Sequence, residues 1–314
     1  MLRMIGRRVA RGLATIVVVS IVAFVVEHIL PGNPAAAVLG PEADPAAVRQ
    51  LNHSLGFDKP LVVQYGDWAR HFITGNLGRS YQSGVSVSHL LKTAAPPTAE
   101  LAVLALAIGV LVGIPLGILA GQWRGKWPDV IVSGFATFGL AVPSFWLGMV
   151  LVILFGTTWH LLPVYGYVPL QQSIGDNLKG MVLPSLSLAA LNVAVLARFT
   201  RSGVVEVLES DYIRTARAKG LTTLVIILRH VMRNAMAVPL TVIGLIIGYT
   251  IGGVVTVEFL FSIPGLGKLA IDSVLGRELA VVQALMVLSA VIVVVSNTAV
   301  DLGYRLLDPR VRLS

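Results

Sequence analysis

The chain has 314 residues, of which 55% are hydrophobic and only 13% are charged, and its mean hydropathy is +0.82. Soluble domains carry roughly 25% charged residues, so this composition excludes an ordinary soluble domain and predicts a polytopic membrane protein. The net charge of +8 comes from basic residues placed between apolar runs, which is typical of membrane topology rather than of nucleic-acid binding, and the absence of cysteine excludes disulfides and thiolate sites.

The first apolar run follows a basic N-terminus. Residues 1–11 contain four arginines and no acid, and the stretch from Gly12 to Leu30 is apolar except near its end. This run is longer than the roughly 7–15 residues of a signal-peptide core. We therefore interpret it as a retained span and expect residues 1–30 to form a cytoplasmic N-terminus and the first transmembrane helix.

Residues 31–97 are polar enough to form an extracytoplasmic loop. Asp44 followed by Pro45 predicts a helix start, with the aspartate as N-cap and the proline in the first turn. A second helix is predicted from Pro60. Its spacing gives one apolar face made of four residues, Leu61, Tyr65, Trp68 and Phe72. We expect most of these side chains to pack onto the rest of the domain.

Residues 98–314 are expected to form the transmembrane core. Its five apolar runs cover about Thr98–Gly121, Val130–Phe155, Met181–Ala197, Ala235–Val257 and Leu279–Ala299. The second span is predicted to start around Pro97, and Pro143 is expected to kink the third. The fold class is therefore all-α with six transmembrane helices. A cytoplasmic N-terminus places twice as many lysines and arginines inside as outside, and it places both termini inside.

A charged segment separates the fourth and fifth spans. Between Val204 and Pro239 the charged residues are Glu206, Glu209, Asp211, Arg214, Arg217, Lys219, Arg229 and Arg233. Charge at the bilayer centre costs several kcal/mol, so this segment is predicted to lie outside the hydrocarbon. Acids precede bases, and Gly220 follows. That order predicts a short helix with Ser210 or Asp211 as N-cap and Gly220 as a left-handed stop.

The string Asp211-Tyr212-Ile213-Arg214-Thr215-Ala216-Arg217-Ala218-Lys219-Gly220 resembles the EAA loop of ABC importer permeases. Alignment on Gly220 puts Arg214 in place of the first glutamate and Arg233 in place of the final proline. These departures resemble the peptide-importer branch. The alternative is an ordinary loop that is basic for topological reasons. The resemblance implies a coupling loop at about residues 201–234, in which these residues contact an ATPase: Asp211, Tyr212, Arg214, Thr215, Ala216, Arg217, Ala218, Lys219 and Gly220.

A second part of the resemblance lies between the fifth and sixth spans. The residues that match its F-x-x-P-G-L-G pattern are Phe261, Pro264, Gly265, Leu266 and Gly267. They are implied to form an outer gate or to contact a binding protein, with small residues near a pore mouth. The tail from Leu307 to Arg312 matches as well. Taken together, the chain resembles the first of two permease subunits of a dipeptide or oligopeptide ABC importer with the type I fold.

The resemblance also implies partners and a location. These are a second permease subunit in a heterodimer, two ATPase subunits, an extracytoplasmic binding protein, membrane lipid and a peptide substrate, with no nucleic acid, in the bacterial cytoplasmic membrane. ATP and Mg²⁺ are implied to bind the ATPase subunits. The chain itself is expected to hold no cofactor or metal and to be no enzyme, because it has no Walker A loop and its six histidines do not cluster. Nickel chelates and glutathione remain open as substrates.

The acidic residues of the apolar runs are Glu27, Glu100, Glu258 and Asp301, and all lie near span ends. Ion-coupled transporters need ionisable or polar groups near the midplane, which argues against a secondary transporter or channel. The resemblance to a coupling loop argues against a purely structural protein. Glu258 and Asp301 remain open as substrate ligands, but we favour anchoring at the membrane interface for both.

Overall fold

The computed structural model describes residues 2–29, 39, 43–55 and 58–307. Every named secondary-structure element among these residues is a helix, and the predicted all-α class is confirmed. The chain divides into two compact units, residues 1–96 with 269–294 and residues 97–268 with 295–314. This division concerns compactness alone, and the expected domain bounds stay a prediction.

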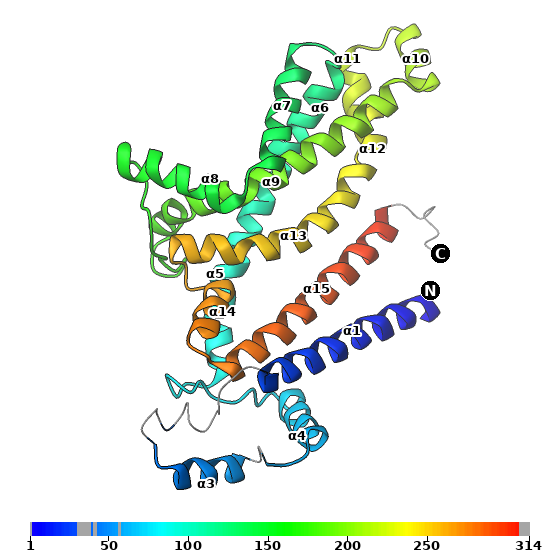
Figure 1. Cartoon of the computed structure of the whole chain (residues 1–314). Coiled ribbons are helices and arrows are strands. Elements are labelled where there is room, and N and C mark those ends of the chain that lie inside the picture. The colour runs from blue at the N-terminus through cyan, green and yellow to red at the C-terminus, as the bar shows by residue number, and fades with distance from the viewer. Residues whose placement is uncertain (1, 30–38, 40–42, 56–57, 308–314) are drawn as a thin grey trace. The chain divides into compact units, whose positions relative to one another are not determined.

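The first unit contains α1 Leu2–Ile29, α3 Pro45–Leu55, α4 Leu61–Ile73, and parts of α5 Val87–Ile108, α14 Leu266–Leu275 and α15 Leu279–Leu307 (Figure 1). The prediction for α3 is confirmed, because Asp44 Oδ1 accepts a hydrogen bond from Ala46 N at 3.0 Å. The aromatic face of α4 packs on α1, with ring centroids of Tyr65 and Trp68 at 5.5 and 6.2 Å from that of Phe24.

The second unit contains α6 Ile114–Gln122, α7 Trp127–Ala141, α8 Ser144–Leu151, α9 Ile174–Leu208, α10 Asp211–Ala218, α11 Thr223–Val225, α12 Met232–Ala235 and α13 Ala237–Phe261. Three π-helical turns, η1 Gly109–Gly113, η2 Val152–Thr158 and η3 Ile226–Val231, join some of these helices end to end. Ser173 is the N-cap of α9, and its hydroxyl accepts from the Asp176 amide at 3.3 Å, so this helix begins before Met181, the predicted start of the fourth span.

Four helices of the described chain are long and apolar enough to cross a membrane: Val87–Gln122, Ile174–Leu208, Ala237–Phe261 and Leu279–Thr298. A pair of shorter apolar helices, Trp127–Ala141 and Ser144–Thr158, adds a fifth if it is one broken span. The apolar part of α1 is Ala10–Val26, which is shorter than the others. The described residues therefore support a multi-pass membrane protein, and the count of six stays a prediction.

Two span predictions need correction. The predicted third span is two helices that meet at 105°. Pro143 follows Val142, which is extended at φ −88° and ψ 123°, because the proline ring disfavours the helical conformation of the residue before it. The second span begins at Val87, about ten residues before Pro97. Val87 and Leu91 are buried, and this packing extends the helix beyond its apolar part.

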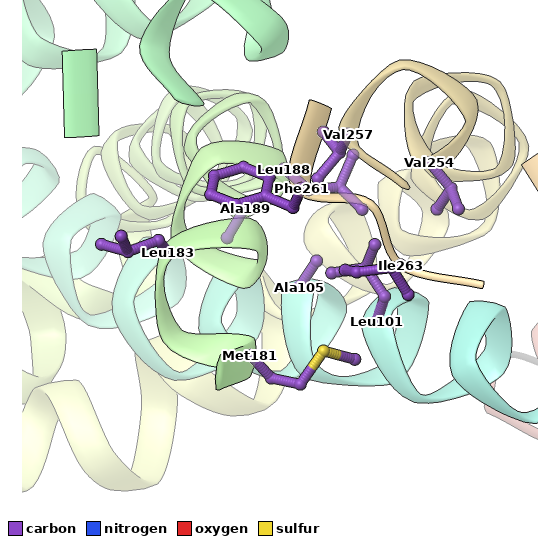
Figure 2. Packing of buried hydrophobic residues seen from close by; sticks show 10 residues of the cluster. All are labelled: Leu101, Ala105, Met181, Leu183, Leu188, Ala189, Val254, Val257, Phe261 and Ile263. Atoms are coloured by element: carbon purple, nitrogen blue, oxygen red, sulfur yellow. The ribbon is translucent and has the colours of Figure 1, made fainter. Parts of the chain in front are cut away.

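α9 runs through the core of the second unit, and 61% of its most apolar stretch is buried. Figure 2 shows one cluster in which Leu101 of α5, Leu188 of α9 and Phe261 of α13 come together. Because apolar helices gain little from burial within lipid, close packing of this kind is what holds such helices together.

Four glycines bring the α5–η1–α6 rod against α9. They recur every fourth residue, at Gly109, Gly113, Gly117 and Gly121. A Cβ at Gly117 would lie 2.5 Å from Thr200 Cβ, and one at Gly113 would lie 2.9 Å from Leu196 Cβ. The two backbones approach so closely only because these positions lack side chains, which is a common solution between membrane helices.

Candidate functional site

The α10 segment begins as predicted, but by a different means. Ser210 is extended at φ −69° and ψ 150°, and its carbonyl accepts from the amides of Ile213 and Arg214 at 3.1 and 3.3 Å. Its hydroxyl does not cap α10, because it donates to the Val207 carbonyl at 2.6 Å. Ser210 thus occupies the N-cap position, while Asp211 lies in the first turn of α10 with its side chain in solvent.

The apolar side of α10 faces the chain's own core. Ile213 is fully buried and Ala216 is 6% exposed. They share a cluster with Val204 of α9 and with residues that follow α10, namely Ile226, Val231 and Ala235. Ala216 is thus covered by the chain itself, and the contact with an ATPase that the resemblance implies for it stays a prediction. The buried side of α10 is therefore packed both against the end of α9 and against residues 226–235.

The other side of α10 is exposed and mostly charged. Tyr212 is 45% exposed, and its hydroxyl accepts from Asn234 Nδ2 at 3.0 Å. Arg214 pairs with Asp211 at 3.3 Å within the helix. The remaining exposed members of the predicted coupling set are Thr215, Arg217, Ala218, Lys219 and Gly220. A partner protein would therefore meet a tyrosine edge and several bases.

Gly220 ends this helix in the left-handed region, as predicted, with φ +76°. Its amide donates to the Arg217 carbonyl at 2.9 Å, and the Leu221 amide donates to the Ala216 carbonyl at 3.3 Å. A Cβ at Gly220 would meet nothing within 4 Å. The requirement for glycine is thus conformational and not steric.

The turn between α6 and α7 is tied to α9 by an ion pair that sequence reasoning missed. Arg201 donates through Nε and Nη2 to the two Asp129 oxygens at 2.5 and 2.8 Å, and the Gly125 amide donates to Asp129 at 2.9 Å. Asp129 is 5% exposed. A second pair joins Arg124 to Glu209. The sequence shows Asp129 at the start of an apolar run, but it does not identify Arg201 as its partner.

Glu258 organises the turn between α13 and α14. It is fully buried, and its carboxylate accepts from Thr98 Oγ1 at 2.5 Å and from the amides of Gly267 and Lys268 at 2.7 and 3.0 Å. The two amides belong to the first turn of α14, whose unpaired N–H groups favour a negative charge. Our expectation of an interfacial anchor is therefore wrong for Glu258. The side chain of Asp301 lies outside the described residues.

The predicted outer-gate residues form the closed turn around this carboxylate. A Cβ at Gly265 would overlap the Glu258 carboxylate, and one at Gly267 would lie 2.5 Å from Val255 Cα. Phe261, Gly265 and Gly267 are buried, Leu266 is half-buried and Pro264 is exposed. The glycines are therefore explained by packing against Glu258. The predicted contact with a binding protein remains a prediction, with Pro264 as its most exposed member.

A neighbouring loop packs on the same end of α13. The Gly166 amide donates to the Phe261 carbonyl at 3.3 Å, and the Tyr167 hydroxyl donates to Glu100 Oε2 at 2.7 Å. Burial raises the pKa of Tyr167 to about 12, and the hydrogen bond to Glu100 adds to the rise. Tyr167 therefore stays a hydrogen-bond donor at neutral pH.

In the first unit, Glu278 plays a part similar to that of Glu258. It is 6% exposed and accepts from Ser80 Oγ at 2.7 Å and from the amides of Tyr81 and Gln82 at 2.8 and 2.7 Å. The side chain of Gln82 in turn donates to the Gly276 carbonyl at 2.9 Å. A carboxylate from the connection after α14 thus fixes a loop about 200 residues earlier in the chain.

Comparisons with known proteins match almost the whole length of the chain. Residues 113–313 match the family described as binding-protein-dependent transport system inner membrane component, and residues 1–102 match its N-terminal counterpart. A putative peptide transport system permease protein of Brucella abortus (strain 2308) is 41% identical over 312 residues, covering 99% of each chain. The glutathione transport system permease protein of Salmonella choleraesuis (strain SC-B67) is 38% identical with the same coverage.

Solved structures agree on the fold. The MetNI methionine ABC transporter, in inward-facing conformations, gives a TM-score of 0.58 at 18% identity, covering 70% of this chain and 96% of that one. An amino acid ABC transporter crystallised with histidines gives 0.51 at 20% identity, covering 69% and 94%. At such identities the likeness concerns the fold alone.

Proposed function

This chain belongs to the family of binding-protein-dependent transport system inner membrane components, and we propose that it forms half of the pathway by which an ATP-driven importer takes up di- and oligopeptides. The peptide assignment is supported by relatives that match along almost their whole length and are named peptide transport permeases. The observation that carries the transport role is the burial of α10 between α9 and residues 226–235.

The proposed complex contains a second permease subunit, two ATPase subunits and an extracytoplasmic binding protein. ATP and Mg²⁺ are bound by the ATPase subunits, and this chain contributes no nucleotide site of its own. The arrangement is supported by the family match and by the exposed side of α10, which presents Tyr212, Arg214, Arg217 and Lys219 to a partner. Pairs between such rim charges mostly tune association rather than add affinity.

The proposed orientation places α10 and both termini in the cytoplasm of a bacterium, with residues 31–97 on the outer face of its cytoplasmic membrane. The excess of lysine and arginine in the segments assigned to the inside supports it. The closed turn at Glu258, which follows the fifth span, then faces outward. That is the side from which a binding protein would deliver substrate.

The mechanism follows from how α10 is held. When the ATPases close on ATP, they displace α10. Only Glu209 and Ser210 separate α10 from α9, and its buried face is packed on η3 and α12, which lead into α13. Helices act as stiff rods, so the displacement passes into α9 and α13 together. The ion pair of Asp129 with Arg201 carries the α6–α7 turn along with α9. Hydrolysis then resets the inward-open state.

The substrate class also agrees with the distribution of charge. Glu258 is fully hydrogen-bonded to the chain itself, and Asp129 is paired with Arg201. Neither carboxylate is available as a fixed ligand for one kind of side chain. A pathway with few fixed charges suits peptides of varied sequence. Glutathione, itself a tripeptide, is the second candidate substrate, because a relative 38% identical over 312 residues is named for its transport.

The test is reconstitution of the four-subunit complex with its binding protein in proteoliposomes. We expect uptake of peptides to require two components. ATP must be present on the side of the membrane that carries the ATPase subunits, and the binding protein must be present on the opposite side. A panel of peptides, glutathione and a nickel chelate then ranks the substrates. Uptake that persists without ATP and follows a proton gradient would reject the proposal.

A further inference from the structure

A hollow of about 250 Å³ lies beside α10, where three apolar helices end. The rod Val87–Gln122 ends at one side of it, α7 begins at Trp127 nearby, and α9 ends at Leu208 in its wall. Figure 1 shows the α6–α7 turn and α11 at the same end of the second unit. The apolar run of the rod Val87–Gln122 ends at Gly121, directly before Gln122 and Trp123, so this wall of the hollow lies near the level of the lipid headgroups.

Two cations line this hollow without a carboxylate partner. They are Lys126 of the α6–α7 turn and Arg217 of α10. Neither forms an ion pair within the described part of the chain. Three nearby carboxylates pair with other residues, Asp129 with Arg201, Glu209 with Arg124 and Asp211 with Arg214, and no carboxylate lines the hollow itself. The hollow therefore carries a net positive charge and suits an anion.

The rest of the lining suits a group that is polar at one end and apolar at the other. Gln122 and Thr223 supply hydrogen-bond donors, while Leu208 and Ile226 supply an apolar wall. Trp123 also lines the hollow, is 40% exposed, and has Lys126 Nζ 6.0 Å from its ring centroid. Tryptophan and lysine at this depth are typical of a membrane interface.

We propose that this hollow binds the phosphate of an anionic phospholipid headgroup, held between Lys126 and Arg217. A basic pocket between membrane helices at their cytoplasmic ends fits that chemistry. The bound headgroup would bridge the α6–α7 turn and α10, so the lipid surface would contact the coupling helix directly. The inference concerns this chain alone and does not depend on the peptide assignment.

The test uses the full-length chain, purified in detergent and examined by native mass spectrometry during titration with lipid. Phosphatidylglycerol is compared with phosphatidylcholine of identical acyl chains. A lysine or arginine near an anionic headgroup contributes roughly a fivefold factor to binding. We expect one tight phosphatidylglycerol, weakened about fivefold by Lys126→Gln or by Arg217→Gln and about 25-fold by both together.

Lys219→Gln is the matched control. Lys219 is exposed two residues from Arg217 but does not line the hollow, so its loss should leave the tight lipid in place. If Lys219→Gln weakens the lipid as much as Lys126→Gln does, the attraction is general and the site is refuted. Equal binding of the two lipids also refutes it.

A second arm separates lipid from other anions. Glycerol 3-phosphate in the millimolar range should displace little phosphatidylglycerol, because it lacks the acyl chains that reach the apolar wall. Full displacement by this soluble ester would mean a site for free phosphate and would overturn the lipid proposal. So would charge variants that weaken binding of the ATPase subunits while leaving phosphatidylglycerol bound, because the occupant would then be a carboxylate of the partner protein.

Discussion

Substitution of Gly265 by alanine tests the closed turn around Glu258. The added Cβ would overlap the Glu258 carboxylate, whose fully buried side chain has no space to move into without breaking its own contacts. The carboxylate would lose some or all of three hydrogen bonds, from Thr98, Gly267 and Lys268. The turn must open, or the charge must stay buried with fewer partners.

The expected cost follows from these three contacts. A hydrogen bond to a charged group contributes roughly 1.5–3 kcal/mol, and a buried charge that loses its partners costs roughly 3–5 kcal/mol. Two of the donors belong to the start of α14, and the third, Thr98, accepts a hydrogen bond from Leu266 of the same helix, so the three losses are not additive. We therefore expect Gly265→Ala to destabilise the chain by about 3–5 kcal/mol.

Gly252→Ala, within α13, provides the matched control. Gly252 is exposed within α13, and a Cβ there would meet nothing within 4 Å. Alanine in a helix interior is favoured over glycine by roughly 0.5–1 kcal/mol. The measurement is the apparent melting temperature of each purified variant in the same detergent. We expect Gly265→Ala to melt roughly 5 °C or more below the wild type and Gly252→Ala to melt at or above it.

Equal melting temperatures for the two variants would contradict this account of the turn. A second variant guards against an indirect effect. Glu258→Ala removes the carboxylate, so a Gly265→Ala change made in that background should cost much less than in the wild type. If the two changes prove additive, the carboxylate is not what requires the glycine.

Three further predictions follow from the packing and the proposed topology. Gly117→Leu should force α6 away from α9 and destabilise the chain by about 3 kcal/mol or more, whereas Gly134→Ala, in open space on α7, should be nearly neutral in the same melting assay. Glu278→Ala should speed hydrogen exchange at the amides of Tyr81 and Gln82, which donate to its carboxylate. Unchanged exchange at these two amides would contradict this prediction. A cysteine at Arg217 should resist membrane-impermeant thiol reagents in intact cells, and labelling there would reverse the orientation.

Local signals in the sequence predicted the elements around α10 well. Gly220 after a run of bases predicts a helix stop, and the left-handed φ of +76° confirms it. The direction in which the helix faces was not predictable in the same way. Ala216 is buried because residues 226–235 fold back over it, and that contact depends on tertiary structure rather than on the spacing within α10.

The sequence did not predict the contacts that Glu258 makes with residues far away in the chain. Glu258 is the last acid before a polar connection, and its sequence context suggests an interfacial position. Its partner Thr98 lies 160 residues earlier in the chain, and the glycines that fit against it were explained by a pore mouth instead. Likewise Pro143 marks the break between α7 and α8, but the angle of 105° depends on how α8 packs against other helices.

The central claim is that α10 transmits movement between an ATPase and the transmembrane helices. The most direct test compares Gly220→Val with Gly220→Asn in the reconstituted four-subunit complex, with peptides transported per ATP hydrolysed as the measured ratio. The left-handed conformation costs a β-branched residue roughly 1–2 kcal/mol or more, whereas asparagine adopts it readily. We predict a reduced ratio for Gly220→Val and a wild-type ratio for Gly220→Asn. A Gly220→Val complex that assembles and keeps the wild-type ratio would contradict the coupling role of α10.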